Sequence, residues 1–464
     1  TDNTYIGYEA ADATHVDASA NTAVGSGAFG GAHTGTVCHY NTAVGASALA
    51  GAMNGADNST AVGKHALQAV TTGGNNTAVG ADAGKAITTG SGNTGVGKDA
   101  LIACIGGSNN VAVGIDSGTA LQGGDNNTFL GSGAGYATTA VNKAVIIGVD
   151  AGFSVMTTAA DGTVAIGYEA GKAITDGNDH TMIGHGAGKI VSGGTNDTFI
   201  GFGAGDATHA SASNNTAVGS GAMGGSHTGS ASTYNDAFGV NSMAGAMNGA
   251  IHNCAFGAGT LAGITNGTSN VGVGHGAGDA ITTGDNNVCI GHGADTGAAD
   301  AQSRMVIGYG FDGTADNAVH IGNNTSHIRC DFNTDQTWDA SSDRRQKKDI
   351  KESELGLDFI NDLKPSKYRY KSPSEFPKEW SAYDADNKEP MGGSDKYYYG
   401  FIAQEVKEAI DNNDASDYGA WNVDKEGRQR VSREQFVVSL VKAVQELSQQ
   451  NDELKARIEA MENA

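Results

Sequence analysis

The residues that could carry chemistry are a serine and a lysine five positions apart, Ser342 and Lys347, in the run Ser342-Asp343-Arg344-Arg345-Gln346-Lys347-Lys348-Asp349-Ile350. A serine hydroxyl is a weak nucleophile that needs a base, and a lysine amine can serve only while it is neutral. Burial and neighbouring cations favour the neutral amine. Five residues span about 500° of a helix, so the two side chains cannot share one helix face. The serine is therefore expected on a loop or strand before the lysine.

A second motif, Gly400-Phe401-Ile402-Ala403-Gln404-Glu405-Val406, follows some fifty residues later. A heptad pattern closes the chain. Together these features resemble the self-cleaving intramolecular chaperone domain at the C-terminus of bacteriophage tail spikes and tail fibres, the endosialidase type.

The resemblance implies that Ser342 is the nucleophile and Lys347 the general base. It implies cleavage of the Ser341–Ser342 bond through an ester that water hydrolyses, with Ser341 as a weaker rival nucleophile. Asp343 and Arg345 are expected to shape the turn. Gln404 and Glu405, from the second motif, are expected to be supporting residues. The activity would be autoproteolysis in cis, with a single turnover and no other enzymatic activity, and we expect neither a cofactor nor a metal.

Composition divides the chain at the same place. The first 340 residues contain 65 of the 71 glycines, none of the four prolines, and eight basic against 26 acidic residues, a net charge of about −18. The last 124 residues contain 20 basic against 25 acidic residues, about −5. Phosphate contacts need clustered basic residues, so nucleic acid is not an expected partner. No apolar run approaches the length of a membrane span, so membrane insertion is not expected.

Five scattered cysteines indicate neither a disulfide framework nor a zinc site, and they fit a reduced assembly compartment. We expect assembly in the host cytoplasm.

The glycines are periodic. A motif of the type Asn-Thr-Ala-Val-Gly recurs nineteen times, mostly every 17 residues, and a larger duplication has an offset of 194. The residue before the motif glycine is always apolar, as at Val24 and Val79, and it is expected to face inward. The position three before the glycine is mostly Thr or Val, and this alternation predicts a strand. Asn stands four before the glycine in twelve motifs and predicts amide ladders between coils.

Seventeen residues are expected to make one coil of two short strands and two turns, stabilised by stacking on its neighbours. The motif is similar to the repeats in the heads of trimeric autotransporter adhesins. That resemblance implies a trimer in which the small residues three after each glycine, such as Ala83 and Ala134, pack near the threefold axis. A single-chain solenoid is the alternative. The predicted fold is mainly β: a trimeric parallel β-solenoid of about 17-residue rungs, followed by a small α+β chaperone domain that ends in a coiled-coil helix.

The predicted domains are a body at 1–325, a neck at 326–341 and the chaperone at 342–464. In the chaperone we expect a helix at 350–363, a strand around Tyr368-Arg369-Tyr370, an apolar segment that becomes helical between Tyr397 and Ile410, and a coiled coil at about 434–463. Its heptad seam is Val437, Leu440, Val444, Leu447, Asn451, Leu454, Ile458 and Met461. By the simple packing rule these residues favour a coiled coil of two helices, whereas the resemblance implies a coiled coil of three.

Longer rungs at roughly 26–40 and 220–234 could carry receptor loops, because loops on a rigid scaffold often recognise ligands. Their candidate contact residues are His33, His39, Tyr40, His227 and Tyr234. The alternative interpretation, given equal weight, is that these segments are solvent-exposed loops with no role in binding. Three further histidines, His185, His275 and His292, follow motif glycines. The last two lie on adjacent rungs and could form rings that hold a metal in a trimer, although no second ligand type accompanies them.

The resemblance therefore implies a homotrimeric phage tail fibre or spike of the virion tail. It would bind a host-surface glycan or protein receptor and join other tail proteins through its N-terminal side. One alternative is a spike that also degrades glycan, but glycosidases need a carboxylate pair, and the body has only two glutamates, Glu9 and Glu169. The other alternative is a bacterial trimeric surface adhesin.

Overall fold

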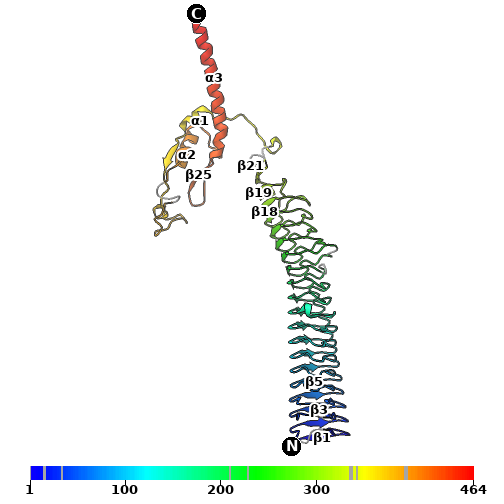
Figure 1. The fold of residues 1–464 in the computed structure, drawn as a ribbon. Helices are drawn as coiled ribbons and strands as arrows, with labels where there is room; N and C mark the ends of the chain where they lie inside the picture. Colours follow the sequence, from blue (N-terminus) through cyan, green and yellow to red (C-terminus); the bar gives the residue numbers. More distant parts are fainter. Residues whose placement is uncertain are drawn as a thin grey trace. The chain divides into compact units, whose positions relative to one another are not determined.

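The structure is a computed structural model that describes residues 2–13, 17–32, 35–207, 211–226, 229–333, 338–340, 343–390 and 396–463. The chain forms two compact units, Thr1–Ser341 and Ser342–Ala464. The first contains the β-solenoid, and the second is a small domain with two antiparallel sheets and a long C-terminal helix (Figure 1). The predicted mainly β architecture is confirmed.

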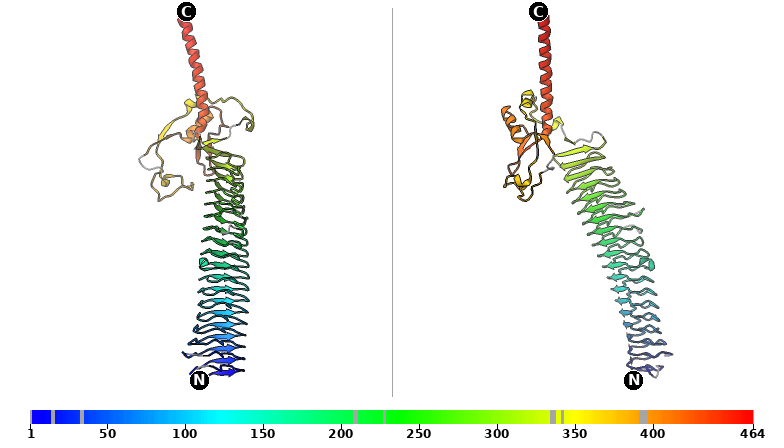
Figure 2. Two further views of the ribbon diagram at one scale, coloured as in Figure 1. Left: turned by 45° about the vertical axis from the view of Figure 1, so that its right-hand side comes forward. Right: turned by 60° about the vertical axis from the view of Figure 1, so that its left-hand side comes forward.

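Each coil of the solenoid contributes one strand, and the strands stack in parallel along one side of the body (Figure 2). Every strand pairs with the same motif position of the next, as in Thr77↔Thr94 and Val79↔Val96. The stacked strands are β1 Thr4–Ile6, β2 Thr22–Val24, β3 Thr42–Val44, β4 Thr60–Val62, β5 Thr77–Val79, β6 Thr94–Val96, β7 Val111–Val113, β8 Thr128–Leu130, β9 Val145–Ile147, β10 Val164–Ile166, β11 Thr181–Ile183, β12 Thr198–Ile200, β13 Thr216–Val218, β14 Asp236–Phe238, β15 Cys254–Phe256, β16 Val271–Val273, β17 Val288–Ile290, β18 Met305–Tyr309 and β19 Ala318–Asn323.

The prediction of two strands in each coil is wrong. The rest of each coil consists of turns and bends, with only isolated parallel bridges such as Ser213↔Thr233 and Asp285↔Gln302. A short 3-10 helix, η1 Thr158–Ala160, lies in one coil. Beyond β19 the direction reverses, because β20 (His327–Asp331) and β21 (Trp338–Ala340) pair antiparallel.

The motif glycine is required by backbone geometry. Gly80 has φ +142°, in the region that favours glycine, and a Cβ there would lie 2.4 Å from the carbonyl oxygen of Gly97 on the next coil. The coils are thus stacked too closely for any side chain at this position. This contact explains why the motif glycine recurs along the body.

The core of the solenoid is lined by the middle residue of each strand, not by the residue before the glycine. Ala23, Phe129 and Phe199 are almost completely buried, whereas Val79 is 38 % exposed. The prediction that the apolar residue before the glycine faces inward is therefore wrong. The alanines three after the glycine, such as Ala83 and Ala134, are fully buried inside their own coil. They cannot pack against a threefold axis, which corrects the second expectation.

The predicted asparagine ladder is present. Asn110 Nδ2 donates to Asn93 Oδ1 at 3.1 Å and to the Gly124 carbonyl at 2.8 Å, and Asn127 Nδ2 donates to Asn110 Oδ1 at 2.9 Å. Each Oδ1 also accepts from the backbone N–H of the next ladder residue, as in Asn127 N to Asn110 Oδ1 at 3.0 Å. These amides are buried. Because buried polar groups are costly when unpaired, the ladder fixes the stacking register.

His180 and Asp197 replace asparagine on two successive coils. Both side chains are fully buried, with His180 Nδ1 3.6 Å from Asp197 Oδ2. Among the described residues, His180 Nε2 and Asp197 Oδ2 have no hydrogen-bond partner. Burial raises the pKa of Asp197 to about 7, an effect opposed by its hydrogen bonds from Asn215. Burial also lowers the pKa of His180 to about 4, partly opposed by Asp179. The fold thus favours the neutral form of both groups.

The C-terminal unit is a small α+β domain. Its core is formed by Phe359, Leu363, Val406, Ala409, Ile410, Ala415, Ala420 and Phe436. Its helices are α1 Leu357–Asp362, α2 Ala403–Asn412 and α3 Phe436–Glu462, its strands are β22 Ser366–Tyr368, β23 Tyr398–Gly400, β24 Trp421–Val423 and β25 Gln429–Val431, and its 3-10 helices are η2 Arg344–Gln346, η3 Pro373–Glu375 and η4 Arg433–Gln435. The helix expected at 350–363 is shorter, because it begins only after Gly356.

Changing the His180–Asp197 pair tests the ladder. The His180→Asn variant keeps Asp197, whose neutral form the fold favours, so its stability should be greatest near pH 4 and fall as pH rises through about 7. The Asp197→Asn variant keeps His180, so its stability should be retained above about pH 6.5 and fall as pH drops through about 4. The measurement is the urea midpoint by circular dichroism.

The double variant His180→Asn/Asp197→Asn extends the amide ladder and removes both buried titrating groups. We expect it to be more stable than wild type across this pH range and to lose both slopes. Equal pH profiles for the two single variants would contradict the assignment.

Candidate functional site

Ser341 and Ser342, the predicted cleavage bond and nucleophile, lie outside the described residues. The residue that follows them, Asp343, begins η2. Its Oδ1 accepts from Arg345 N at 2.8 Å, and its Oδ2 accepts from Arg345 Nη2 at 2.7 Å. The hydrogen bonds from the Arg345 side chain and backbone lower the pKa of Asp343. The structure thus brings Asp343 and Arg345 together in one capped turn.

Lys347, the predicted base, closes this turn. Its backbone N–H donates to the Arg344 carbonyl at 3.1 Å, and its own backbone is extended, with φ −114° and ψ 144°. Lys347 is therefore not part of a helix. The Lys347 side chain is exposed on this single chain. A lysine base needs burial or neighbouring cations to become neutral, so burial within one chain does not supply that condition.

The segment after the turn is tied to α3, a connection that spans about ninety residues of sequence. Lys442 Nζ lies 2.6 Å from Glu352 Oε1. Glu446 Oε2 accepts from Leu357 N at 2.7 Å and so caps the first turn of α1. A Cβ at Gly356 would lie 2.3 Å from Glu446 Oε2, so a larger residue there would displace this carboxylate. Sequence reasoning missed these residues, because nothing in the local pattern links Glu446 to Leu357.

The second motif runs from Gly400, the last residue of β23, into the first turn of α2. Gln404 is exposed and lines a cavity of about 640 Å³, whereas Glu405 Oε2 is buried and has no hydrogen-bond partner among the described residues. The two predicted supporting residues therefore have different surroundings. Whether either assists cleavage stays a prediction.

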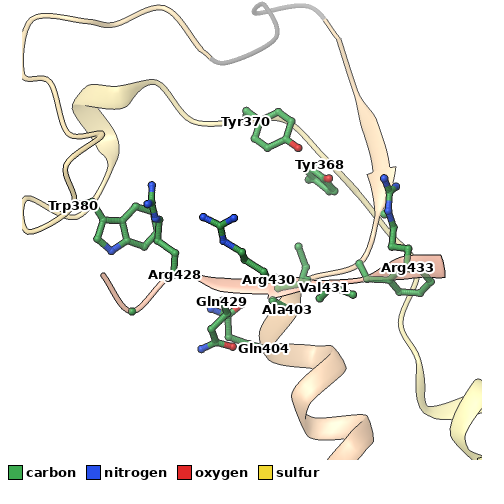
Figure 3. Close-up of a pocket in the computed structure, with 14 residues that line it drawn as sticks. Tyr368, Tyr370, Trp380, Ala403, Gln404, Arg428, Gln429, Arg430, Val431 and Arg433 are labelled. Carbon is green, nitrogen blue, oxygen red and sulfur yellow. The ribbon is translucent and has the colours of Figure 1, made fainter. Parts of the chain in front are cut away.

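The cavity beside Gln404 is cationic and aromatic (Figure 3). Tyr368 and Tyr370 lie on one side, and Arg428 and Arg430 project from the region of β25. Asp424 accepts from Arg428 Nε at 2.8 Å and from Arg430 Nη2 at 3.2 Å, so two of the positive charges are partly neutralised. Arg433 also lines the cavity.

The predicted seam of α3 carries large apolar side chains that are largely exposed. Val437 is 58 % exposed and Val444 63 %. At its N-terminal end the seam borders an apolar cavity of about 260 Å³, lined also by Ile360, Pro365 and Phe436. The helix is confirmed, and the coiled coil stays a prediction.

The candidate receptor residues are only partly described, because His33 and His227 lie outside the described residues. Tyr40 is 65 % exposed and Tyr234 55 %. Both have left-handed backbone, φ 61° and 58°, and immediately precede buried ladder asparagines. His39 Nδ1 lies 2.9 Å from Ser19 Oγ. The tyrosines are thus accessible at the corners of coils.

The histidines after motif glycines stack with neighbouring rings. His275 lies on His292, with ring centroids 5.0 Å apart, and His292 stacks on Tyr309 at 5.4 Å. His185 lies between Tyr168 and Phe202. Within the described ranges, no group of three or more His, Cys, Asp or Glu side chains is placed to hold a metal ion. Within the same ranges, no helix is both long and apolar enough to cross a membrane.

Two carboxylate sites of the body bear on glycan cleavage. Lys172 and Lys189 each contact Glu169 at 2.6 Å, and these hydrogen bonds lower the pKa of Glu169 to about 2. Burial raises the pKa of Asp295 to about 6, helped by its hydrogen bond with Asp279. A glycosidase pair is separated by about 5 Å or more, so directly hydrogen-bonded carboxylates do not fit that chemistry.

Removing the Glu446 cap tests the connection between α3 and the turn. Glu446→Ala leaves Leu357 N without its acceptor, and loss of such a cap costs about 1 kcal/mol. We expect faster amide hydrogen exchange at Leu357 and the residues after it, measured by mass spectrometry. Glu459→Ala, on the distal part of the same helix, is the matched control and should leave α1 exchange unchanged. Equal exchange in both variants would show that the contact is dispensable.

One comparison with known proteins gives a match. No curated protein and no solved structure matches the chain. Residues 342–414 match the model of the peptidase S74 family, described as the chaperone of endosialidase. The match contains the Ser342–Lys347 turn and the α2 motif. It implies that the C-terminal domain of this chain is an autoproteolytic chaperone.

Proposed function

We propose that this protein is a fibre or spike of a bacteriophage tail that assembles as a homotrimer and removes its own C-terminal chaperone by cleavage between Ser341 and Ser342. The observation that carries the proposal is the position of the chaperone match. It begins at residue 342, at the boundary between the two compact units and after the β-solenoid.

The proposed reaction uses Ser342 and Lys347. The Lys347 amine takes the proton of Ser342 Oγ, and the oxygen bonds to the carbonyl carbon of Ser341. The C–N bond to Ser342 then breaks, and its nitrogen receives the proton from Lys347. The resulting ester is hydrolysed by water, which yields a carboxylate at Ser341 and restores the hydroxyl. Asp343 and Arg345 hold the turn that follows Ser342 in the sequence.

Exposure of Lys347 supports a reaction that depends on assembly. Cover by another copy of the chain would bury this amine, and burial favours the neutral form that a general base needs. Cleavage would then report that chains have associated. Two contacts tie the segment after this turn to α3, the predicted association helix: the ion pair of Glu352 with Lys442, and the hydrogen bond from Leu357 N to Glu446.

Removal of the chaperone has a physical benefit. Parallel stacking depends on pairings between distant residues, which form slowly and leave strand edges exposed meanwhile. A clamp at the C-terminus would set the register of the chains. Once it is removed, the shaft is held by the barrier to unfolding, a form of kinetic stability.

The proposed setting is the virion tail, with assembly in the host cytoplasm. The N-terminal side would join other tail proteins, and the body would bind a host-surface glycan or protein through exposed side chains such as Tyr40 and Tyr234. The Glu169 ion pairs and the direct Asp279–Asp295 contact do not have the geometry of a glycosidase pair, so the proposed role is attachment without glycan cleavage. Release of reducing sugar from host glycan would contradict this part.

The cleavage assignment predicts a simple gel result. Purified wild type should give two fragments, 1–341 and 342–464, on a denaturing gel, and Ser342→Ala should give only the full-length chain. Lys347→Met should also stay uncleaved, because it cannot accept the proton. Intact mass spectrometry identifies the ends.

Two controls separate the neighbouring residues. Ser341→Ala and Lys348→Met alter the residues beside the proposed pair and should still be cleaved. Cleavage of Ser342→Ala together with failure of Ser341→Ala would move the nucleophile to Ser341.

A further inference from the structure

The outward face of the solenoid sheet is a surface of the body that the proposed function does not yet explain. In β1–β18 the two flanking motif positions of each strand point away from the core, while the middle residue points into it, as in Thr77, Ala78 and Val79. These positions form two continuous columns along the stack. The residues of the second column are apolar throughout, and eight of them are at least 36 % exposed: Ile6, Val44, Val79, Leu130, Ile200, Phe256, Val273 and Ile290.

Charge is nearly absent from this face. Among its 36 positions, two in each of eighteen strands, only Asp236 is charged, although the body carries about 34 charged residues. Parallel sheets are almost always covered on both faces. A monomer rarely exposes an apolar patch larger than a few hundred Å². The face therefore has the composition of a buried protein surface, although it is exposed to solvent in the single chain.

We propose that this sheet face is the lengthwise contact surface between copies of the chain. A neighbouring solenoid of the same sequence has the same spacing between coils, so its columns can stay in register with these along the whole shaft. A globular partner would cover only part of the stack. The strongly acidic remainder of the body also disfavours contact between copies through any other side.

A second apolar surface, in the other unit, supports the same partner. The seam of α3 exposes apolar residues at heptad spacing, including Leu440, Leu447 and Leu454, each about half exposed. This spacing is recognised by another helix of the same kind. Two different elements of one chain are thus built for contact with copies of that chain.

This inference adds the location of the interface to the proposed function. The number of copies in the assembly, three, is taken from the proposed function. In this interface the contact residues between chains are Val79 and its equivalents, not the alanines of the earlier prediction, which are buried. The test uses the uncleaved full-length Ser342→Ala chain, so that failure of cleavage and failure of association are seen separately.

Lysines on the sheet face should disrupt association. In the Ser342→Ala chain, we expect Val79→Lys with Val273→Lys to shift the molar mass, measured by light scattering after size-exclusion chromatography, from three chains towards one. The matched control is Ile105→Lys with Ile190→Lys, which changes residues of similar exposure away from the sheet face. It should stay trimeric. Equal mass for both variants, or a monomeric parent chain, would overturn the proposal.

A cross-link provides a test without disruptive substitutions. Cys254 lies on the outward face of β15 and is half-buried, whereas the other four cysteines are buried. A short bismaleimide should join the parent chains into dimers on a denaturing gel, and Cys254→Ser should remove the product. Absence of a cross-link in associated chains would place the interface elsewhere. If the lysine variant unfolds, as judged by circular dichroism, the Cys254 result decides.

Discussion

The stacking of one coil on the next is the interaction on which this molecule depends. Each strand is only a few residues long and has no stability alone, so its backbone groups must be paired with both neighbours. The asparagine ladder provides hydrogen-bond partners for the buried polar groups at the corner of each coil. The motif glycine allows the backbones of neighbouring coils to approach each other closely. Stability is consequently cooperative along the stack, and a poorly matched pair such as His180 and Asp197 weakens it locally.

The same constraint shapes the C-terminal domain. When several chains of similar coils associate, many of their registers are nearly equivalent. In the proposed function, a domain with its own core and a long helix with a heptad seam would supply a unique reference point. The turn that contains Asp343 and Lys347 is connected to that helix through Glu352 and Glu446. Register and bond cleavage are thus structurally related.

Several features could be predicted from the sequence because they repeat. Nineteen copies of the motif made the ladder and the strands visible, and the heptads gave α3 nearly to its ends. The sequence pattern could not show which face of each strand points into the core. Alternation shows that Thr77 and Val79 share a face, but a large apolar side chain on a face between subunits resembles one in the core. The absence of threonine from the middle position of the strands was the available signal.

The local site was harder to predict. The Asp343–Arg345 turn follows from neighbouring residues, whereas the cap on Leu357 comes from Glu446, far along the chain. Helix α1 begins late because Gly356 precedes it, and the space at that glycine is filled by the same carboxylate.

The constant register between strands also has an evolutionary consequence. Because Thr77 pairs with Thr94 as Thr4 pairs with Thr22, most coils present similar joining strands to their neighbours. Unequal recombination between repeats can therefore insert or delete whole coils without creating a mismatched junction. The duplication with an offset of 194 residues is the trace expected of such an event. The length of the shaft is thus an easily inherited variable, while its cross-section is conserved.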